Sequence, residues 1–124
     1  MVKDDCIFCK IANGEIESRT LYEDEEFRVI LDMGPATKGH ALILPKAHYA
    51  DLFALPEELA VKAAALAKRR AAKMKEKLSC DGFNLVQNNG EAAGQTVFHF
   101  HLHLIPRYRD DGQKILWQPT KPPP

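Results

Sequence analysis

The segment His99-Phe100-His101-Leu102-His103-Leu104-Ile105-Pro106 carries three of the five histidines of the chain, at every second position. In a β-strand, residues two apart point to the same face of the sheet. The spacing therefore predicts a strand over residues 97–105 in which the three imidazoles share one face. The opposite face then carries Phe98, Phe100, Leu102 and Leu104. Imidazole titrates near neutral pH and can act as nucleophile, acid, base or metal ligand. A row of imidazoles about 6.6 Å apart therefore indicates chemistry more than core packing.

The size and charge of the chain narrow the class of protein. Its 124 residues fit a single domain over residues 1–124, long enough for a core that needs no cross-links. The 17 basic and 17 acidic side chains cancel, which argues against partners such as nucleic acid or a membrane surface. No apolar stretch approaches the roughly 20 residues of a membrane span, and the N-terminus lacks a signal-peptide core, so we expect a cytoplasmic protein. Three cysteines, an odd number, do not suggest a disulfide framework.

Local patterns predict a mixed α+β fold with an antiparallel sheet. A short helix is expected to open at Cys6 and to stop at Asn13-Gly14, and a long helix to run from Leu55 to Leu78. The long helix has an apolar stripe at three- to four-residue spacing, formed by Leu59, Ala63, Leu66, Ala67, Met74 and Leu78. Strands are expected at residues 20–23, 27–32, 39–45, 83–87 and 97–105.

A glycine-containing loop, residues 88–96, delivers the chain to the histidine strand. Glycines allow backbone N–H groups to approach an anion closely. Gln95 and Thr96 add side-chain donors, and Asn88 offers an amide just upstream. Such a loop is most often only a connection between strands. Its position directly before three histidines makes it a plausible phosphate cradle.

The histidines themselves fit nucleophilic chemistry at phosphorus. A neutral imidazole nitrogen can attack phosphorus and form a covalent phosphoramidate, which divides one difficult displacement into two easier ones. His101 occupies the middle of the run, and His103 can stabilise phosphoryl oxygens or protonate the leaving group. The alternative is a set of hydrogen-bonded histidines on a half-buried sheet, which is the commoner explanation for a single histidine.

Metal binding by this run is limited by geometry. Ligand nitrogens must lie about 2 Å from one ion, whereas the outer pair of the run is about 13 Å apart at the backbone. One strand histidine with partners elsewhere is more reasonable. Cys6 and Cys9 form a C-x-x-C that supplies two thiolates, and His48 with one strand histidine can complete a tetrahedral zinc site. A redox motif or two unliganded thiols are the alternatives.

Taken together, these residues resemble the histidine-triad (HIT) family, whose motif is His-x-His-x-His followed by two apolar residues. The resemblance points to its Hint-like branch of small nucleotide hydrolases and transferases, in the zinc-carrying bacterial form. It extends over about residues 6–107 and leaves residues 108–124 as a C-terminal tail. Besides the triad it rests on Cys6-Ile-Phe-Cys9-Lys, Tyr22-Glu-Asp, Leu31-Asp32, Lys38-Gly-His40, Leu44-Pro45-Lys46, His48, Asn88 and Gly94-Gln-Thr-Val97.

The resemblance implies a fold and an activity. The HIT-like fold is a five-stranded antiparallel sheet with one long and one short helix, in a homodimer whose sheets join across the two-fold axis. The ligand is a purine mononucleotide with its α-phosphate over the triad. His101 is then the nucleophile that forms a nucleotidyl-histidine intermediate, flanked by His103 and His99 and supported by His40. Further residues are implied in nucleotide binding: Asp32 at the ribose, Ile7, Phe8 and Leu31 at the base, and Asn88, Gly94, Gln95, Thr96 and Val97 at the phosphate side.

The same resemblance assigns zinc ligands and leaves the substrate open. In zinc-carrying bacterial members, the ligands correspond to Cys6, Cys9, His48 and His99, which makes zinc a structural cofactor. The leading activity is that of a nucleoside phosphoramidase acting on AMP-lysine-type substrates. The segment Pro106-Arg107-Tyr108-Arg109 also occurs in relatives that hydrolyse dinucleoside polyphosphates, so that activity is an alternative. A nucleotide-binding scaffold with low turnover is the third possibility.

Overall fold

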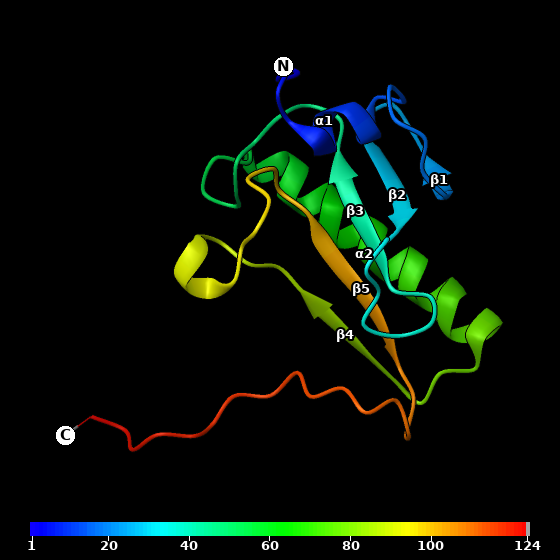
Figure 1. Cartoon of the computed structure of the whole chain (residues 1–124), viewed down its shortest axis with the longest axis vertical. Helices are drawn as coiled ribbons and strands as arrows, with labels where there is room; N and C mark the ends of the chain where they lie inside the picture. The colour runs from blue at the N-terminus through cyan, green and yellow to red at the C-terminus, as the bar shows by residue number, and fades with distance from the viewer. Residues whose placement is uncertain (124) are drawn as a thin grey trace.

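The computed structural model describes residues 1–123, and its elements follow the predicted order closely. The helices are α1 (Ile7–Ala12), α2 (Glu57–Leu78) and the 3-10 turn η1 (Glu91–Ala93). The strands are β1 (Thr20–Glu23), β2 (Phe27–Leu31), β3 (Ala41–Pro45), β4 (Gly82–Val86) and β5 (Leu102–Arg107). The five strands form one antiparallel sheet in the order β1-β2-β3-β5-β4, which confirms the predicted α+β class and sheet (Figure 1).

The two helices cover opposite faces of the sheet. One cluster of buried residues joins α2 to β2, β3 and β5, through side chains such as Leu66, Val29 and Leu104. A second cluster joins α1 to the other face of β2 and β3, through Ile11 and Leu42 among others. Because successive strand residues point to opposite faces, every residue of β3 is buried against one layer or the other. The sheet is thus held between a long helix and a short one.

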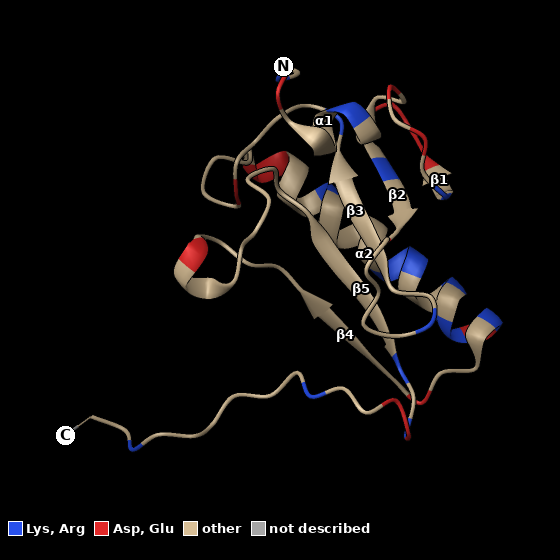
Figure 2. Ribbon diagram, viewed as in Figure 1, with Lys and Arg blue, Asp and Glu red and all other residues tan. Residues whose placement is uncertain are grey.

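Helix α2 confirms the predicted long amphipathic helix. Of the predicted stripe, Ala63, Leu66, Ala67 and Met74 are buried, and Leu59 and Leu78 pack at its ends. Two acidic residues lie in its first turn, and basic residues gather in its second half, as Figure 2 shows. This distribution matches the helix dipole. No helix within residues 1–123 is both long enough and apolar enough to cross a membrane.

The histidine strand begins later than predicted. The expected strand over residues 97–105 is wrong at its start, because β5 runs from Leu102 to Arg107. The backbone before it leaves the ladder: the Phe100 N–H donates to the Tyr49 carbonyl at 2.7 Å. Within β5, His103 pairs with Leu42 on β3 and with Val86 on β4. The triad therefore spans a strand end, with one histidine in the sheet and two in the segment leading to it.

Candidate functional site

Side chains of residues 100–104 alternate between the two faces of the sheet as predicted, although the strand itself begins only at Leu102. Phe100, Leu102 and Leu104 pack into the core beneath α2, as expected, whereas Phe98 is half exposed. The imidazoles face the opposite side, toward α1. The ring of Phe8 packs edge-on against His101, with centroids 5.0 Å apart, and His101 lies 5.1 Å from His103. The triad rings thus pack closely together, and α1 covers them on one side through Phe8.

Hydrogen bonding fixes which nitrogen of His101 is free. Its Nδ1 lies 2.7 Å from the backbone carbonyl of His99. A carbonyl oxygen only accepts, so the proton of a neutral His101 ring is on Nδ1. The Nε2 atom then carries an unprotonated lone pair. That is the state a nitrogen nucleophile needs, and a backbone group enforces it.

A second chain of bonds orients His40 and His103. The Ala36 N–H donates to Nδ1 of His40 at 2.9 Å, so the His40 proton is on Nε2. That Nε2–H lies 2.9 Å from Nδ1 of His103. The His103 proton is therefore on its own Nε2, where it can be donated. Burial, with the neighbouring His101 and His40, lowers the pKa of His103 to about 4, so the ring is neutral near pH 7. Burial also lowers the pKa of His40.

Asp32 joins this group and lines a broad cleft. One carboxylate oxygen lies 3.4 Å from Nε2 of His40, and the other accepts the Gly34 N–H at 2.8 Å. The cleft has a volume of about 1090 Å³ and is lined by Ile7, Leu31, Asp32 and His40, as well as by residues that the sequence analysis did not single out, such as Ile16 and Arg28. Ile7 is 53% exposed although it is apolar. An apolar cleft with a carboxylate beside a histidine pair has the make-up of a small-molecule site.

The loop before the triad is braced from within by Gln95. This buried side chain accepts the Gly90 N–H at 2.7 Å and donates to the Ala50 and Val97 carbonyls at 2.7 and 3.0 Å. Its amide therefore holds the loop and is not free to donate to a phosphate, contrary to the donor role predicted for it. Thr96 is exposed, and the Asn88 amide nitrogen lies close to Gly94, 3.8 Å from where a Cβ on that glycine would be. The side chains of Thr96 and Asn88, rather than that of Gln95, are therefore the polar groups that the loop can offer to a ligand.

A separate cluster brings together the four predicted metal ligands. One ligand atom each from Cys6, Cys9, His48 and His99 lies within 4.8 Å of all the others. The two sulfurs are each 3.4 Å from Nδ1 of His99, and the Cys9 sulfur is also 3.4 Å from Nδ1 of His48. A tetrahedral zinc ion with ordinary bond lengths separates sulfur from nitrogen by about 3.5 Å. The spacing of the cluster fits that ion.

The chemistry of the cluster fits a cation as well. Nδ1 of His99 has one lone pair, yet two sulfurs converge on it, an arrangement that a single ion satisfies better than two hydrogen bonds do. The other nitrogen of this ring, Nε2, lies 2.8 Å from the Pro45 carbonyl, so it carries the proton and leaves Nδ1 free. Burial lowers the pKa of His99 to about 4, which keeps this ring in the neutral form that binds a metal. Burial raises the pKa of the Cys9 thiol, so an ion that binds there has to displace the thiol proton. The described residues thus supply two thiols and two neutral imidazoles.

Several groups that build the site escaped the sequence analysis. The Ala36 N–H and the carbonyls of Pro45 and His99 each fix the tautomer of a histidine. These are backbone groups, which every residue has, so no side-chain pattern marks them. The expected strand over residues 39–45 is also wrong at its start, because β3 begins at Ala41 and Gly39, with a φ of +91°, turns the chain before His40.

Comparison with known proteins identifies the family. The model of the HIT domain matches residues 13–110. An uncharacterized HIT-like protein of Methanocaldococcus jannaschii, MJ0866, is 44% identical over 116 residues, covering 94% of this chain and 89% of that protein. The adenosine 5'-monophosphoramidase HNT1 of Saccharomyces cerevisiae is 43% identical over 116 residues, covering 94% of this chain and 71% of that protein. The chain belongs to the HIT family.

Solved structures agree with this assignment. A HIT family protein from Bacillus anthracis superposes with a TM-score of 0.88 at 49% identity, covering 94% of this chain and 83% of that one. A zinc-bound histidine triad family protein from Mycobacterium smegmatis superposes with a TM-score of 0.84 at 43% identity, covering 94% and 84%. The chain therefore shares both the fold and most of its length with these proteins.

Proposed function

We propose that this protein is a purine nucleoside phosphoramidase, which cleaves the P–N bond of an AMP-lysine-type substrate through a nucleotidyl-His101 intermediate. The coarser assignment, a nucleotide hydrolase or transferase of the HIT family, rests on the family match and on the named activity of the yeast relative. The observation that carries the nucleophile in this proposal is the bond from Nδ1 of His101 to the His99 carbonyl, and the choice of a phosphoramidate as substrate rests on the named activity of the yeast relative. That bond leaves Nε2 of His101 unprotonated, in a ring whose centroid lies 5.1 Å from that of His103.

In the first step, the Nε2 lone pair of His101 attacks the α-phosphorus of the bound nucleotide. The P–N bond to the leaving amine breaks, and the amine nitrogen takes up a proton from solvent as it departs. The Nδ1–H of His101 remains on the His99 carbonyl, which stabilises the positive charge that develops on the ring. In the second step, water attacks the same phosphorus and releases one proton to solvent, the bond to Nε2 breaks, and AMP leaves with the free imidazole restored.

His103 is proposed to act through its Nε2–H. It donates to a phosphoryl oxygen or to the leaving amine as charge develops. His40 holds His103 in that tautomer, because the chain of bonds ends at the Ala36 N–H. A backbone amide does not release its proton at neutral pH. This chain of hydrogen bonds therefore holds the protons of His40 and His103 on particular nitrogens and does not serve as a proton relay.

The nucleoside is proposed to occupy the cleft beside the triad. Asp32 accepts from the ribose hydroxyls, and Ile7, Phe8 and Leu31 form the apolar base wall, as the resemblance implies. Support comes from the lining of the cleft by Ile7, Leu31 and Asp32, and from the contact of Phe8 with His101. Asn88, Gly94, Thr96 and Val97 stay proposed for the phosphate side, with Gln95 as the brace of their loop.

Zinc is proposed as the structural cofactor of the cluster formed by Cys6, Cys9, His48 and His99. When bound, it would supply a fixed tetrahedral cross-link between the start of α1 and the start of the triad. This separates the duties of the histidines, because His99 is engaged by the ion while His101 and His103 stay free. The relative from Mycobacterium smegmatis is described as zinc-bound, which supports the proposal.

A homodimer is proposed for the assembly. Within residues 1–123, β4 pairs with β5 alone, so its outer edge lacks a neighbouring strand. Leu85 on this strand is 55% exposed. An unpaired edge that carries an exposed apolar side chain is suited to pairing with a second copy, which would join two sheets.

The test is a comparison of turnover on adenosine phosphoramidate and on diadenosine polyphosphates. The proposal expects faster hydrolysis of the phosphoramidate, and the reverse order would favour the dinucleoside alternative. The His101→Ala variant should lose turnover on the phosphoramidate while it still binds AMP, measured by calorimetry. AMP binding without turnover in the wild-type protein would support the low-turnover scaffold instead.

A further inference from the structure

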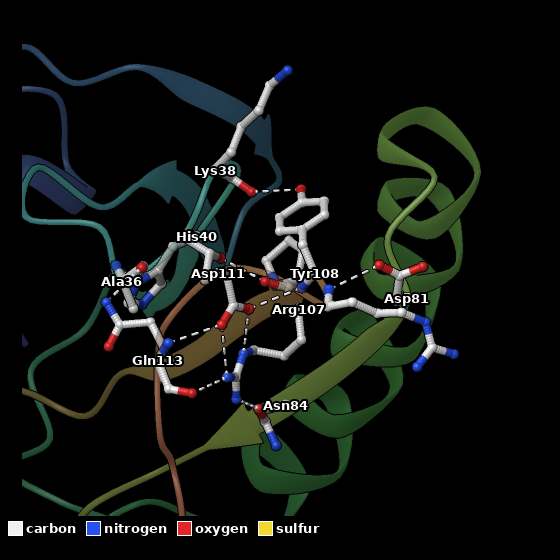
Figure 3. Close-up of polar contacts among 12 residues, drawn as sticks. Ala36, Lys38, His40, Asp81, Asn84, Arg107, Tyr108, Asp111 and Gln113 are labelled. Carbon is white, nitrogen blue, oxygen red and sulfur yellow. Dashed lines mark hydrogen bonds and ion pairs between the residues drawn. The ribbon is translucent and has the colours of Figure 1, made fainter.

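The segment after β5 folds back on the loop that carries His40. Arg107 ends β5, and its guanidinium holds the carboxylate of Asp111 with two bonds, Nε to Oδ2 at 2.9 Å and Nη2 to Oδ1 at 3.1 Å. The same guanidinium donates to Asn84 on β4 at 2.8 Å and to the Gln113 carbonyl at 2.6 Å. Figure 3 shows these groups around one arginine. We refer to residues 107–113 as the C-terminal clasp.

The carboxylate of Asp111 shapes the turn within the clasp. It accepts the backbone N–H groups of Tyr108 and Gln113, both at 2.9 Å. The bonds from Arg107 and from these two amides hold the pKa of Asp111 well below its usual range. A bidentate pair that also binds backbone is a rigid unit, unlike an ordinary surface ion pair. The clasp is therefore built to hold a fixed shape.

Two side chains of the clasp reach the His40 loop. The amide of Gln113 donates to the Ala36 carbonyl at 2.9 Å, and the Tyr108 hydroxyl donates to the Lys38 carbonyl at 2.8 Å (Figure 3). These bonds hold the loop on both sides of Thr37, which is itself bonded to the Pro106 carbonyl. Ala36 matters here because it is held at both of its backbone groups: its carbonyl accepts from Gln113, and its N–H, in the preceding peptide group, fixes the tautomer of His40.

We propose that the C-terminal clasp positions the His40–His103 pair, with Gln113 and Tyr108 as positioning residues that act through the peptide groups of residues 36–38. Among the described residues, the hydrogen bonds of the clasp reach Ala36 and Lys38, of which Lys38 also lines the cleft, and none of them ends on a triad histidine. The clasp sets the place of the Ala36 N–H, and through it the orientation of His40 and the Nε2–H of His103. As a role in turnover, this inference rests on the proposed function.

The test uses two substitutions that keep size but remove one donor each. Gln113→Glu replaces the donating amide by an oxygen facing the Ala36 carbonyl, and Tyr108→Phe removes the hydroxyl that binds the Lys38 carbonyl. The control is Lys114→Ala, since this side chain is exposed and follows the clasp directly. For each variant we would measure the melting temperature, kcat and KM on adenosine phosphoramidate, and the ¹⁵N signals of the His40 ring, which distinguish protonated from unprotonated nitrogens.

The expected result is a fall in kcat of about fivefold in each variant, the size of one net hydrogen bond, with KM within about twofold of wild type. The His40 ring signals should shift toward a mixture of tautomers, while Lys114→Ala matches wild type in every measurement. A fall in kcat with unchanged His40 signals would overturn the inference, and so would a change confined to KM or unchanged kcat. If the wild-type protein does not turn over, the proposed function fails, and the His40 signals still decide whether the clasp positions this ring.

Discussion

Gly39 offers a sharp test of how the fold supports the site, because an alanine there meets two separate obstacles. Its φ of +91° lies in a region that residues with a side chain rarely adopt. A Cβ at this position would also lie 2.6 Å from the Cδ1 atom of Leu78 at the end of α2, and 3.4 Å from Pro106. The Gly39→Ala change therefore combines backbone strain with a steric overlap directly beside His40.

The magnitude can be assembled from these two parts. Backbone strain at a positive φ costs about 1–2 kcal/mol. The overlap costs about 1–2 kcal/mol, the lower part of the range for overpacking, because the end of the Leu78 side chain can move. The sum is about 2–4 kcal/mol of unfolding free energy, or roughly 8–15 °C in melting temperature for a chain of this size.

The assay is urea and thermal unfolding of four variants. Gly90→Ala is the matched control: its φ is +88°, yet its Cβ would meet no atom within 4 Å, so it isolates the backbone strain. Leu78→Ala, alone and combined with Gly39→Ala, completes a double-mutant cycle. We expect Gly39→Ala to cost at least about 1 kcal/mol more than Gly90→Ala, and the double variant to be more stable than additivity predicts. Equal costs for the two glycines, or strict additivity with Leu78→Ala, would refute the steric argument.

Three further outcomes test other parts of the molecule. Purified protein should contain about one zinc per chain, measured by atomic emission. The Cys6→Ser variant should lose the metal and melt at a lower temperature, whereas the Cys80→Ser variant should keep it. A wild-type protein that is metal-free after purification without chelator would contradict the zinc proposal. Because Arg107 holds the pKa of Asp111 below its usual range, the stabilisation that this carboxylate gives is complete above about pH 5 and is lost as the pH falls below about 4. In the Asp111→Asn variant, the melting temperature should therefore fall less between pH 5 and lower pH than it does in the wild type. An equal fall in both proteins would show that another group causes it. Sedimentation velocity should give twice the chain mass for wild type, with monomers for Leu85→Arg; a monomeric wild type would contradict the dimer.

The fold was largely predictable because its elements have strong local signals. The α2 helix has Pro56 before its first turn and a periodic apolar stripe, and it ends at Leu78 as expected. The start of β5 was not predictable in the same way. Alternation continues through His99 and His101, but the Tyr49 carbonyl, 51 residues before Phe100 in the sequence, captures the backbone there. A competing long-range hydrogen bond leaves no mark on local periodicity.

The candidate site was also predictable only in part, and again the part set by side-chain types was the predictable one. The ligand cluster could be anticipated, because Cys6 and Cys9 are distinctive residues whose chemistry requires partners, and the structure brings them to His99 across 93 and 90 residues. The role of Gln95 could not be anticipated, because the sequence does not show whether a glutamine amide is buried and bonded within its loop or exposed to a ligand. The tautomers depend on backbone groups such as the Ala36 N–H, which sequence patterns do not record.

The most direct test of the central claim is to map the covalent intermediate by rapid-quench mass spectrometry. Wild-type protein is mixed with adenosine phosphoramidate, quenched in alkali during the first turnover, and digested. We predict that the peptide containing His101 carries one adenylyl group, attached to this histidine, at early times and loses it as AMP appears. An adenylyl group on another residue, or full turnover with no labelled peptide at any time, would contradict the assignment of His101 as the nucleophile.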